Sequence, residues 1–184
     1  MLETDRLILR PWQESDAEDL YSYAKDADIG TMADWSPHKS MEDSLQVIRT
    51  VFSAPETYAM ELRESGKAIG CVGLLLEDGY LDTADDETEI GYWVGKPYWG
   101  QGLVPEAVKA VAAHTFNKLG KNRLWACCFI DNHRSQRVLE KCGFVFHHLR
   151  KASNPGERNL FFYVLHKQDF VNQSQSNESP LQNA

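Results

Sequence analysis

The hydrophobic positions of the chain follow two different periods. Apolar runs rich in β-branched and aromatic residues predict strands over residues 6–10, 57–63, 67–76, 88–94, 122–130, 144–149 and 160–166. Apolar residues that recur three and four positions apart predict helices over residues 15–24, 40–52, 103–119 and 131–142. Helices interleaved with strands in this order indicate one α/β domain with a mixed sheet and no internal repeat.

Local signals mark where several of these elements begin and end. The runs Ser15-Asp-Ala-Glu18 and Ser40-Met-Glu-Asp43 resemble capping boxes at helix starts. Residues 29–39 and the acidic stretch 77–87 are expected to be irregular. Asn, Gln and Ser dominate from Val171 onward, so we expect a folded domain over residues 1–168 and a polar, mobile tail over 169–184.

The composition is that of an ordinary globular protein. The 184 residues are 42% hydrophobic and 25% charged, with a formal net charge of −8. An acidic chain is poorly suited to binding nucleic acid, and it weakly favours a cationic substrate. No apolar run approaches the roughly 20 residues that cross a bilayer, and the first residues lack the pattern of a signal peptide. A cytoplasmic protein without a nucleic-acid or membrane partner is therefore expected.

Neither the cysteines nor the histidines show the spacing of a metal site. The four cysteines form no Cys-x-x-Cys pair; they are Cys71, Cys127, Cys128 and Cys142. We expect reduced, mostly buried thiols and no metal cofactor. Successive residues of a strand point to opposite faces, so neither the two adjacent cysteines nor His147 and His148 are expected to share a ligand.

Residues 89–106 carry the strongest chemical signal in the chain. An aromatic strand runs into a turn with glycines at positions 100 and 102, and a helix follows. The first N–H groups of a helix are unpaired, and the helix dipole adds partial positive charge there. Glycine lets an anion approach the backbone and tolerates positive φ. The pattern favours a phosphorylated ligand held by backbone amides, with an ordinary turn as the alternative.

Four short motifs occur in order: Leu2-Glu-Thr-Asp-Arg-Leu, Glu89-Ile-Gly-Tyr-Trp, Tyr98-Trp-Gly-Gln-Gly and Asn132-x-x-Ser135. With them the chain resembles the GNAT N-acetyltransferases over about residues 2 to 168. Within that family it is most similar to the Rim-type branch, which includes the ribosomal-protein N-terminal acetyltransferases. The resemblance implies the GNAT fold, an α/β fold whose mixed central sheet of six to seven strands is flanked by about four helices.

Two positions depart from the general GNAT pattern. Pro97 stands where many members have Gln or Arg, three residues before the first glycine of the turn, so backbone amides are expected to make most pyrophosphate contacts. Leu139 stands where many members have a Tyr that protonates the departing thiolate. Ser135 therefore becomes the candidate acid.

The resemblance implies an acetyl-CoA-dependent enzyme with a role for each motif. Glu89 is the candidate base and Ser135 the candidate acid. The pantetheine arm is expected to lie along the strand of residues 88–94, and an N–H near Val94 to polarise the thioester carbonyl. The expected acetyl-CoA ligands are Trp93, Val94, Gly100, Gln101, Gly102, Leu103, Asn132 and, at the 3′-phosphate, Arg137 and Lys141.

Each of these roles competes with a structural one. Glu89 also fits a strand-edge carboxylate paired with a surface cation, and Trp93 fits a plain core aromatic. Ser135 suits the N-terminus of its helix. Asn132 can act as helix cap, as cofactor ligand or as both, because its side chain has donors and an acceptor.

The expected reaction is transfer of an acetyl group from acetyl-CoA to a primary amine by direct attack. No Cys occupies a motif position, which disfavours a covalent acyl-enzyme. The leading acceptor is a protein or peptide N-terminus, with a small-molecule amine close behind, and a monomer and a homodimer are equally compatible with the sequence. A GNAT-fold module that binds CoA as a sensor or structural part, without chemistry, is the alternative.

Overall fold

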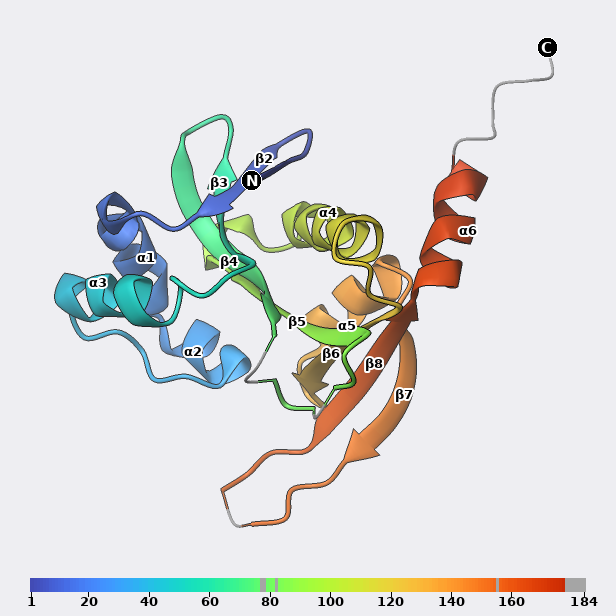
Figure 1. Ribbon diagram of the computed structural model, residues 1–184. Coiled ribbons are helices and arrows are strands. Elements are labelled where there is room, and N and C mark those ends of the chain that lie inside the picture. The colour runs from blue at the N-terminus through green and yellow to red at the C-terminus, as the bar shows by residue number, and fades with distance from the viewer. Residues whose placement is uncertain (77–78, 82, 155, 178–184) are drawn as a thin grey trace. The chain divides into compact units, whose positions relative to one another are not determined.

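The computed structural model describes residues 1–76, 79–81, 83–154 and 156–177 (Figure 1). Its contacts divide the chain into two units. The N-terminal unit comprises Met1–Leu75 and Ile90–Ala112, and the C-terminal unit comprises Leu76–Glu89 and the residues from Ala113 onward. Strand β5 (Glu87–Val94) and helix α4 (Leu103–Asn117) each begin in one unit and end in the other.

The sheet of the N-terminal unit is an antiparallel meander followed by the second half of β5. Its strands lie in the order β1 (Leu2–Glu3), β2 (Leu7–Pro11), β3 (Thr57–Leu62), β4 (Lys67–Leu75) and β5. The N–H of Gly95, which follows β5, donates to the carbonyl of Ile69 in β4 at 2.9 Å. A Cβ at Gly70 would lie 2.4 Å from the carbonyl oxygen of Trp93, so only glycine allows these two strands to approach so closely there.

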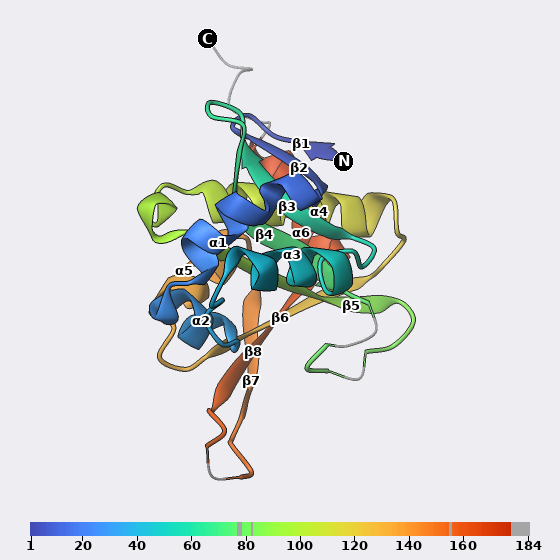
Figure 2. The same cartoon turned by 90° about the vertical axis from the view of Figure 1, so that its left-hand side faces the viewer.

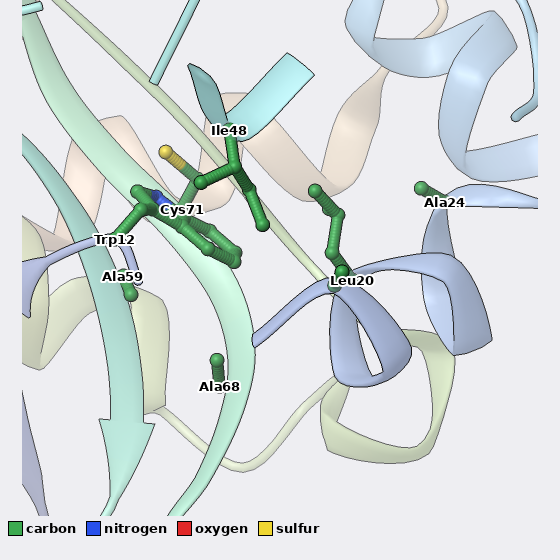
Figure 3. Close-up of a cluster of buried hydrophobic side chains, with 8 residues drawn as sticks. Trp12, Leu20, Ala24, Ile48, Ala59, Ala68 and Cys71 are labelled. Carbon is green, nitrogen blue, oxygen red and sulfur yellow. The ribbon is translucent and has the colours of Figure 1, made fainter. Parts of the chain in front are cut away.

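Helices cover both faces of this sheet. Helices α1 (Ala17–Ala24), α2 (Ala27–Ala33) and α3 (Met41–Thr50) lie over one face, and the first turns of α4 lie over the other (Figures 1 and 2). Between α1, α3 and the strands, a buried cluster includes Trp12, Leu20, Ile48 and Cys71 (Figure 3). The core of this unit is therefore built from amphipathic helices packed on the apolar face of a sheet.

The C-terminal unit continues from the first half of β5. Residues Glu87 to Glu89 pair in parallel with the start of β6 (Arg123–Phe129), with Glu89 opposite Trp125. Strand β8 (Leu160–His166) pairs antiparallel with β6 on one side and with β7 (Val145–Arg150) on the other. Helix α5 (His133–Lys141) packs against β6, and α6 (Lys167–Asn177) follows β8 directly (Figure 1).

The mixed α/β sheet predicted from the sequence is confirmed, with eight strands in the order β1-β2-β3-β4-β5-β6-β8-β7 rather than six to seven. The additional strand is β1, whose two residues pair with β2. The described residues form six α-helices, where the sequence predicts about four. None of these helices combines the length and the apolar character needed to cross a membrane.

The two helices that the sequence pattern does not predict are α2 and α6. Helix α2 overlaps the stretch 29–39 expected to be irregular, and it is capped by Asp26, whose side chain accepts the N–H of Asp28 at 2.9 Å. Helix α6 runs across the predicted domain boundary at residue 168 and replaces the first part of the expected mobile tail. It is held by Phe170, whose ring centroid lies 5.4 Å from that of Phe116. Residues 178–184 of that tail lie outside the described residues.

Candidate functional site

The turn between β5 and α4 has the backbone geometry of an anion site. Gly100 and Gly102 have φ values of 76° and 77°, in the left-handed region that favours glycine. A Cβ at Gly100 would meet no atom within 4 Å, so glycine is required there by the backbone conformation rather than by crowding. Both glycines and Gln101 are exposed, and Leu103 begins helix α4. The exposed backbone of residues 100–102 is thus the part of the turn that an anion can approach.

Two side chains of the turn donate hydrogen bonds to backbone carbonyls of the same segment. The Gln101 amide donates to the carbonyl of Pro97 at 2.8 Å, and the Trp99 indole N–H donates to the carbonyl of Val94 at 3.0 Å. Pro97 lies in the short 3-10 helix η2 (Lys96–Tyr98) that precedes the glycines. The Gln101 side chain therefore shapes the turn.

A charged clasp fastens the same turn to the N-terminal segment. Glu106, in the first turn of α4, accepts the Thr4 hydroxyl at 2.6 Å, the Arg6 backbone N–H at 2.8 Å and the Arg6 Nε–H at 2.7 Å. Arg6 Nη1 also donates to the carbonyl of Gln101 at 2.9 Å. These contacts join the motif at residues 2–7 to the glycine turn. The sequence motifs give no sign of this pairing, although Arg6 lies in the first motif and Glu106 ends the stretch 89–106.

Trp93 and Val94 belong to the end of β5 in the N-terminal unit. Val94 is 7% exposed. Trp93 is half-buried, packs against the core cluster, and meets Trp35 edge to face with ring centroids 5.9 Å apart. The N–H of Gly95, the residue after Val94, donates to the Ile69 carbonyl in β4. The contacts of Trp93 support the core-aromatic interpretation.

Asn132 and Ser135 form the N-terminus of α5 in the C-terminal unit. The Asn132 side chain accepts the Ser135 backbone N–H at 3.1 Å, so Asn132 is the helix cap. The Ser135 hydroxyl hydrogen-bonds the thiol of Cys128, which opposes the effect of burial that raises the pKa of Cys128 to about 11. Farther along the helix, Arg137 and Lys141 are exposed and stand four residues apart, on one face.

Glu89 is buried where β5 pairs with β6. It is 1% exposed, and its Oε2 accepts the Tyr80 N–H at 2.8 Å. The Cys127 thiol and the Leu81 N–H also hydrogen-bond the carboxylate, and Arg150 contributes favourable charge. Burial raises the pKa of Glu89 above its ordinary value, and these donors together with Arg150 oppose the shift. A carboxyl group tuned in this way is suited to general base catalysis.

Glu89 is buried rather than placed at an exposed strand edge, and the nearby cation is the exposed Arg150. Glu87, two residues earlier in β5, accepts hydrogen bonds from Arg123 Nη1 at 2.5 Å and from the Trp125 indole N–H at 2.7 Å. A Cβ at Gly79 would lie 2.8 Å from Glu89 Oε2, so glycine allows the segment before Tyr80 to close over the carboxylate.

The structure gathers the candidate residues into two groups. The N-terminal unit contains Trp93, Val94, Gly100, Gln101, Gly102 and Leu103. The C-terminal unit contains Glu89, Asn132, Ser135, Arg137 and Lys141. Within the second group, Glu89 contacts Cys127 and Ser135 contacts Cys128. Adjacent strand residues point to opposite faces, so these contacts place the candidate base and the candidate acid on opposite faces of β6.

Comparisons with known proteins show the family of the chain. A family model described as Acetyltransferase (GNAT) domain matches residues 6–145. The chain is 30% identical over 174 residues to YoaA, an uncharacterized N-acetyltransferase of Bacillus subtilis. This alignment covers 89% of this chain and 96% of YoaA. It is 29% identical over 65 residues to the ribosomal-protein-serine acetyltransferase of Escherichia coli. These residues cover 35% of this chain and 36% of that protein.

A solved structure shows the same fold. The spermidine N-acetyltransferase of Vibrio cholerae, in complex with CoA and spermine, superposes with a TM-score of 0.73 at 15% sequence identity. The superposition covers 91% of this chain and 99% of that protein.

Proposed function

This chain belongs to the GNAT family of acetyltransferases, and from that premise we propose that it acetylates the N-terminal amine of a protein or peptide by direct attack on acetyl-CoA. Transfer of an acetyl group from acetyl-CoA is the activity of the family. The identity of the amine and the roles of single residues are the proposal. The observation that carries it is the buried Glu89 carboxylate with its raised pKa.

Glu89 accepts the proton that the attacking amine must lose. The α-amine of a peptide has a pKa near 7.7–8.0, whereas an alkyl amine such as a Lys side chain has a pKa near 10.4. A carboxylate whose pKa lies above its ordinary value is a stronger base toward either amine. Near neutral pH the less basic α-amine has the larger neutral, nucleophilic fraction, which favours an N-terminal amine over an alkyl amine.

Ser135 assists departure of the CoA sulfur. As the amine nitrogen bonds to the carbonyl carbon, the carbon–sulfur bond breaks and negative charge develops on sulfur. The Ser135 hydroxyl already hydrogen-bonds a sulfur atom, that of Cys128. This contact supports Ser135 as the group that hydrogen-bonds and protonates the leaving thiolate.

The cofactor contacts predicted from the sequence complete the proposal. The backbone of the turn at Gly100, Gln101, Gly102 and Leu103 would bind the pyrophosphate. Trp93, Val94 and Asn132 would line the pantetheine arm, and Arg137 with Lys141 would meet the 3′-phosphate. The left-handed φ values at the two glycines and the exposure of the two cations support these roles.

A small polyamine is the second candidate acceptor. The structural neighbour from Vibrio cholerae is a spermidine N-acetyltransferase, and the net charge of −8 on this chain would attract a polycation. The higher pKa of alkyl amines ranks this candidate below a peptide N-terminus.

The test is an acetylation assay with a matched set of amines, read by mass spectrometry of the products. One peptide carries a free N-terminus and an internal Lys; its twin has the N-terminus blocked; spermidine is the third acceptor. We expect acetylation of the first peptide at its N-terminus only. Modification of the blocked twin or of spermidine alone would contradict the proposed acceptor, and the absence of any product with all three would contradict the proposed reaction with these amines.

A further inference from the structure

Cys127, which lies outside the predicted site, contacts the candidate base. Strand β6 places Trp125 opposite Glu89, and Cys127 lies two residues farther along the same face. Its thiol hydrogen-bonds the Glu89 carboxylate, and the backbone of Tyr80 and Leu81 supplies the other donors. A carboxylate that is 1% exposed depends on such donors, because water cannot replace them.

The surroundings of Cys127 keep it a protonated donor rather than a nucleophile. Burial raises the pKa of the Cys127 thiol, and the adjacent charge of Glu89 raises it further. Reactive cysteines show the reverse, a pKa lowered by neighbouring cations or a helix N-terminus. A thiol that stays protonated can donate its hydrogen to the carboxylate throughout the neutral range.

We propose that Cys127 is a positioning residue for acetyl transfer, whose thiol orients the Glu89 carboxylate and stabilises its charged form, so that this contact sets the pH at which the enzyme becomes active. The inference rests on the proposed role of Glu89 as base. Among the described residues, the charged and titratable groups resolved near Glu89 are Cys127 on β6, Arg150 on β7, and Glu87 on β5, which Arg123 neutralises. Of these, only Cys127 donates a side-chain hydrogen bond to Glu89 among the contacts resolved for the described residues.

The first measurement is the pH dependence of kcat/KM in the full-length protein. Cys127→Ala removes a hydrogen-bond donor from the charged form of Glu89, so the pKa of Glu89 should rise. The acidic limb of the pH profile, where kcat/KM falls as Glu89 is protonated, should then move to higher pH by about one unit. Activity on the alkaline plateau should stay within about twofold of wild type, because the base itself is intact. Cys127→Ser keeps a donor and should return the limb to its wild-type position. Cys71→Ala, which removes a buried thiol from the N-terminal unit, should leave the limb unchanged.

The second measurement follows Glu89 directly, by its 13C carboxyl resonance, assigned from the signal that Glu89→Gln removes. A shift of this titration in Cys127→Ala, reversed in Cys127→Ser and matched by the rate limb, supports the inference. A Glu89 titration that does not move overturns it. A titration that moves while the rate limb stays fixed overturns Glu89 as the base, and with it the catalytic consequence of Cys127. Loss of activity at every pH in both Cys127 variants would instead identify a nucleophilic cysteine and overturn the positioning role.

Discussion

The Arg6→Lys variant tests whether the clasp at the glycine turn contributes to cofactor binding as well as to the stability of the N-terminal segment. The Arg6 guanidinium reaches two acceptors at once, the Gln101 carbonyl at 2.9 Å and Glu106 Oε2 at 2.7 Å. A Lys ammonium is a single point donor and cannot reproduce this fork. The Arg6→Lys variant should therefore release the carbonyl of Gln101.

The magnitude follows from the number and exposure of the lost contacts. A hydrogen bond that involves a charged group contributes about 1.5–3 kcal/mol when well shielded. Because the Arg6 side chain is 48% exposed, water replaces much of this interaction in the variant. We therefore expect the free energy of unfolding to fall by about 1 kcal/mol. In a protein of this size the melting temperature should fall by about 2–4 °C. If acetyl-CoA must order the released turn, the same 1 kcal/mol appears as a KM for acetyl-CoA raised about fivefold.

The matched control is Arg63→Lys. Arg63 donates to the Thr4 carbonyl at 3.0 Å and to Glu3 at 2.6 Å, so it ties down the same N-terminal segment without touching the turn. Steady-state kinetics and thermal melts of both variants should show similar losses of stability, with the KM for acetyl-CoA raised only by Arg6→Lys. An unchanged KM in Arg6→Lys, or an equal rise in Arg63→Lys, would refute the assignment of the clasp to cofactor binding.

Three further predictions concern other parts of the molecule. Ser135→Ala should lower kcat at least tenfold with the KM for acetyl-CoA within about twofold, and an unchanged kcat would remove Ser135 from the chemistry. Gly100→Ala should cost about 1 kcal/mol in denaturant unfolding because alanine disfavours the left-handed φ of 76°, whereas Gly91→Ala, with its nearest neighbour at 3.9 Å, should be tolerated. Phe170→Ala should destabilise the protein by about 2 kcal/mol, less than for a fully buried ring, through lost contact with Phe116; equal stability would show that α6 is not held there.

Local chemistry accounts for the elements that the sequence predicts well. Ser40 caps α3 through the Asp43 N–H at 3.1 Å, as the capping pattern indicates. Strand β8 occupies Leu160–His166, the bounds predicted from its apolar run. These features depend on a few neighbouring residues, so the one-dimensional pattern contains the information that determines them.

Features that depend on a distant partner are not visible in the pattern. His147 and His148 are predicted to point to opposite faces, yet their ring centroids lie 5.0 Å apart. The register of β7 against β8 shifts between Phe146 and His148, and such a bulge changes the alternation of side chains. Helix α6 is likewise polar in composition, and its Phe170 packs on Phe116, more than 50 residues earlier in the chain.

The sequence alone determined the class of the protein: a mixed α/β sheet, a glycine turn at a helix start, an Asn-capped helix, and through these the GNAT family. Each of these is a local pattern, because backbone freedom at glycine and capping by Asn act within one turn of chain. The tertiary structure decided the environments of the chemical groups. It buried Glu89 against Cys127, joined Ser135 to Cys128, and fastened the glycine turn to Arg6. Burial and hydrogen bonding set the pKa of an ionisable group, and both come from residues that only the fold brings together.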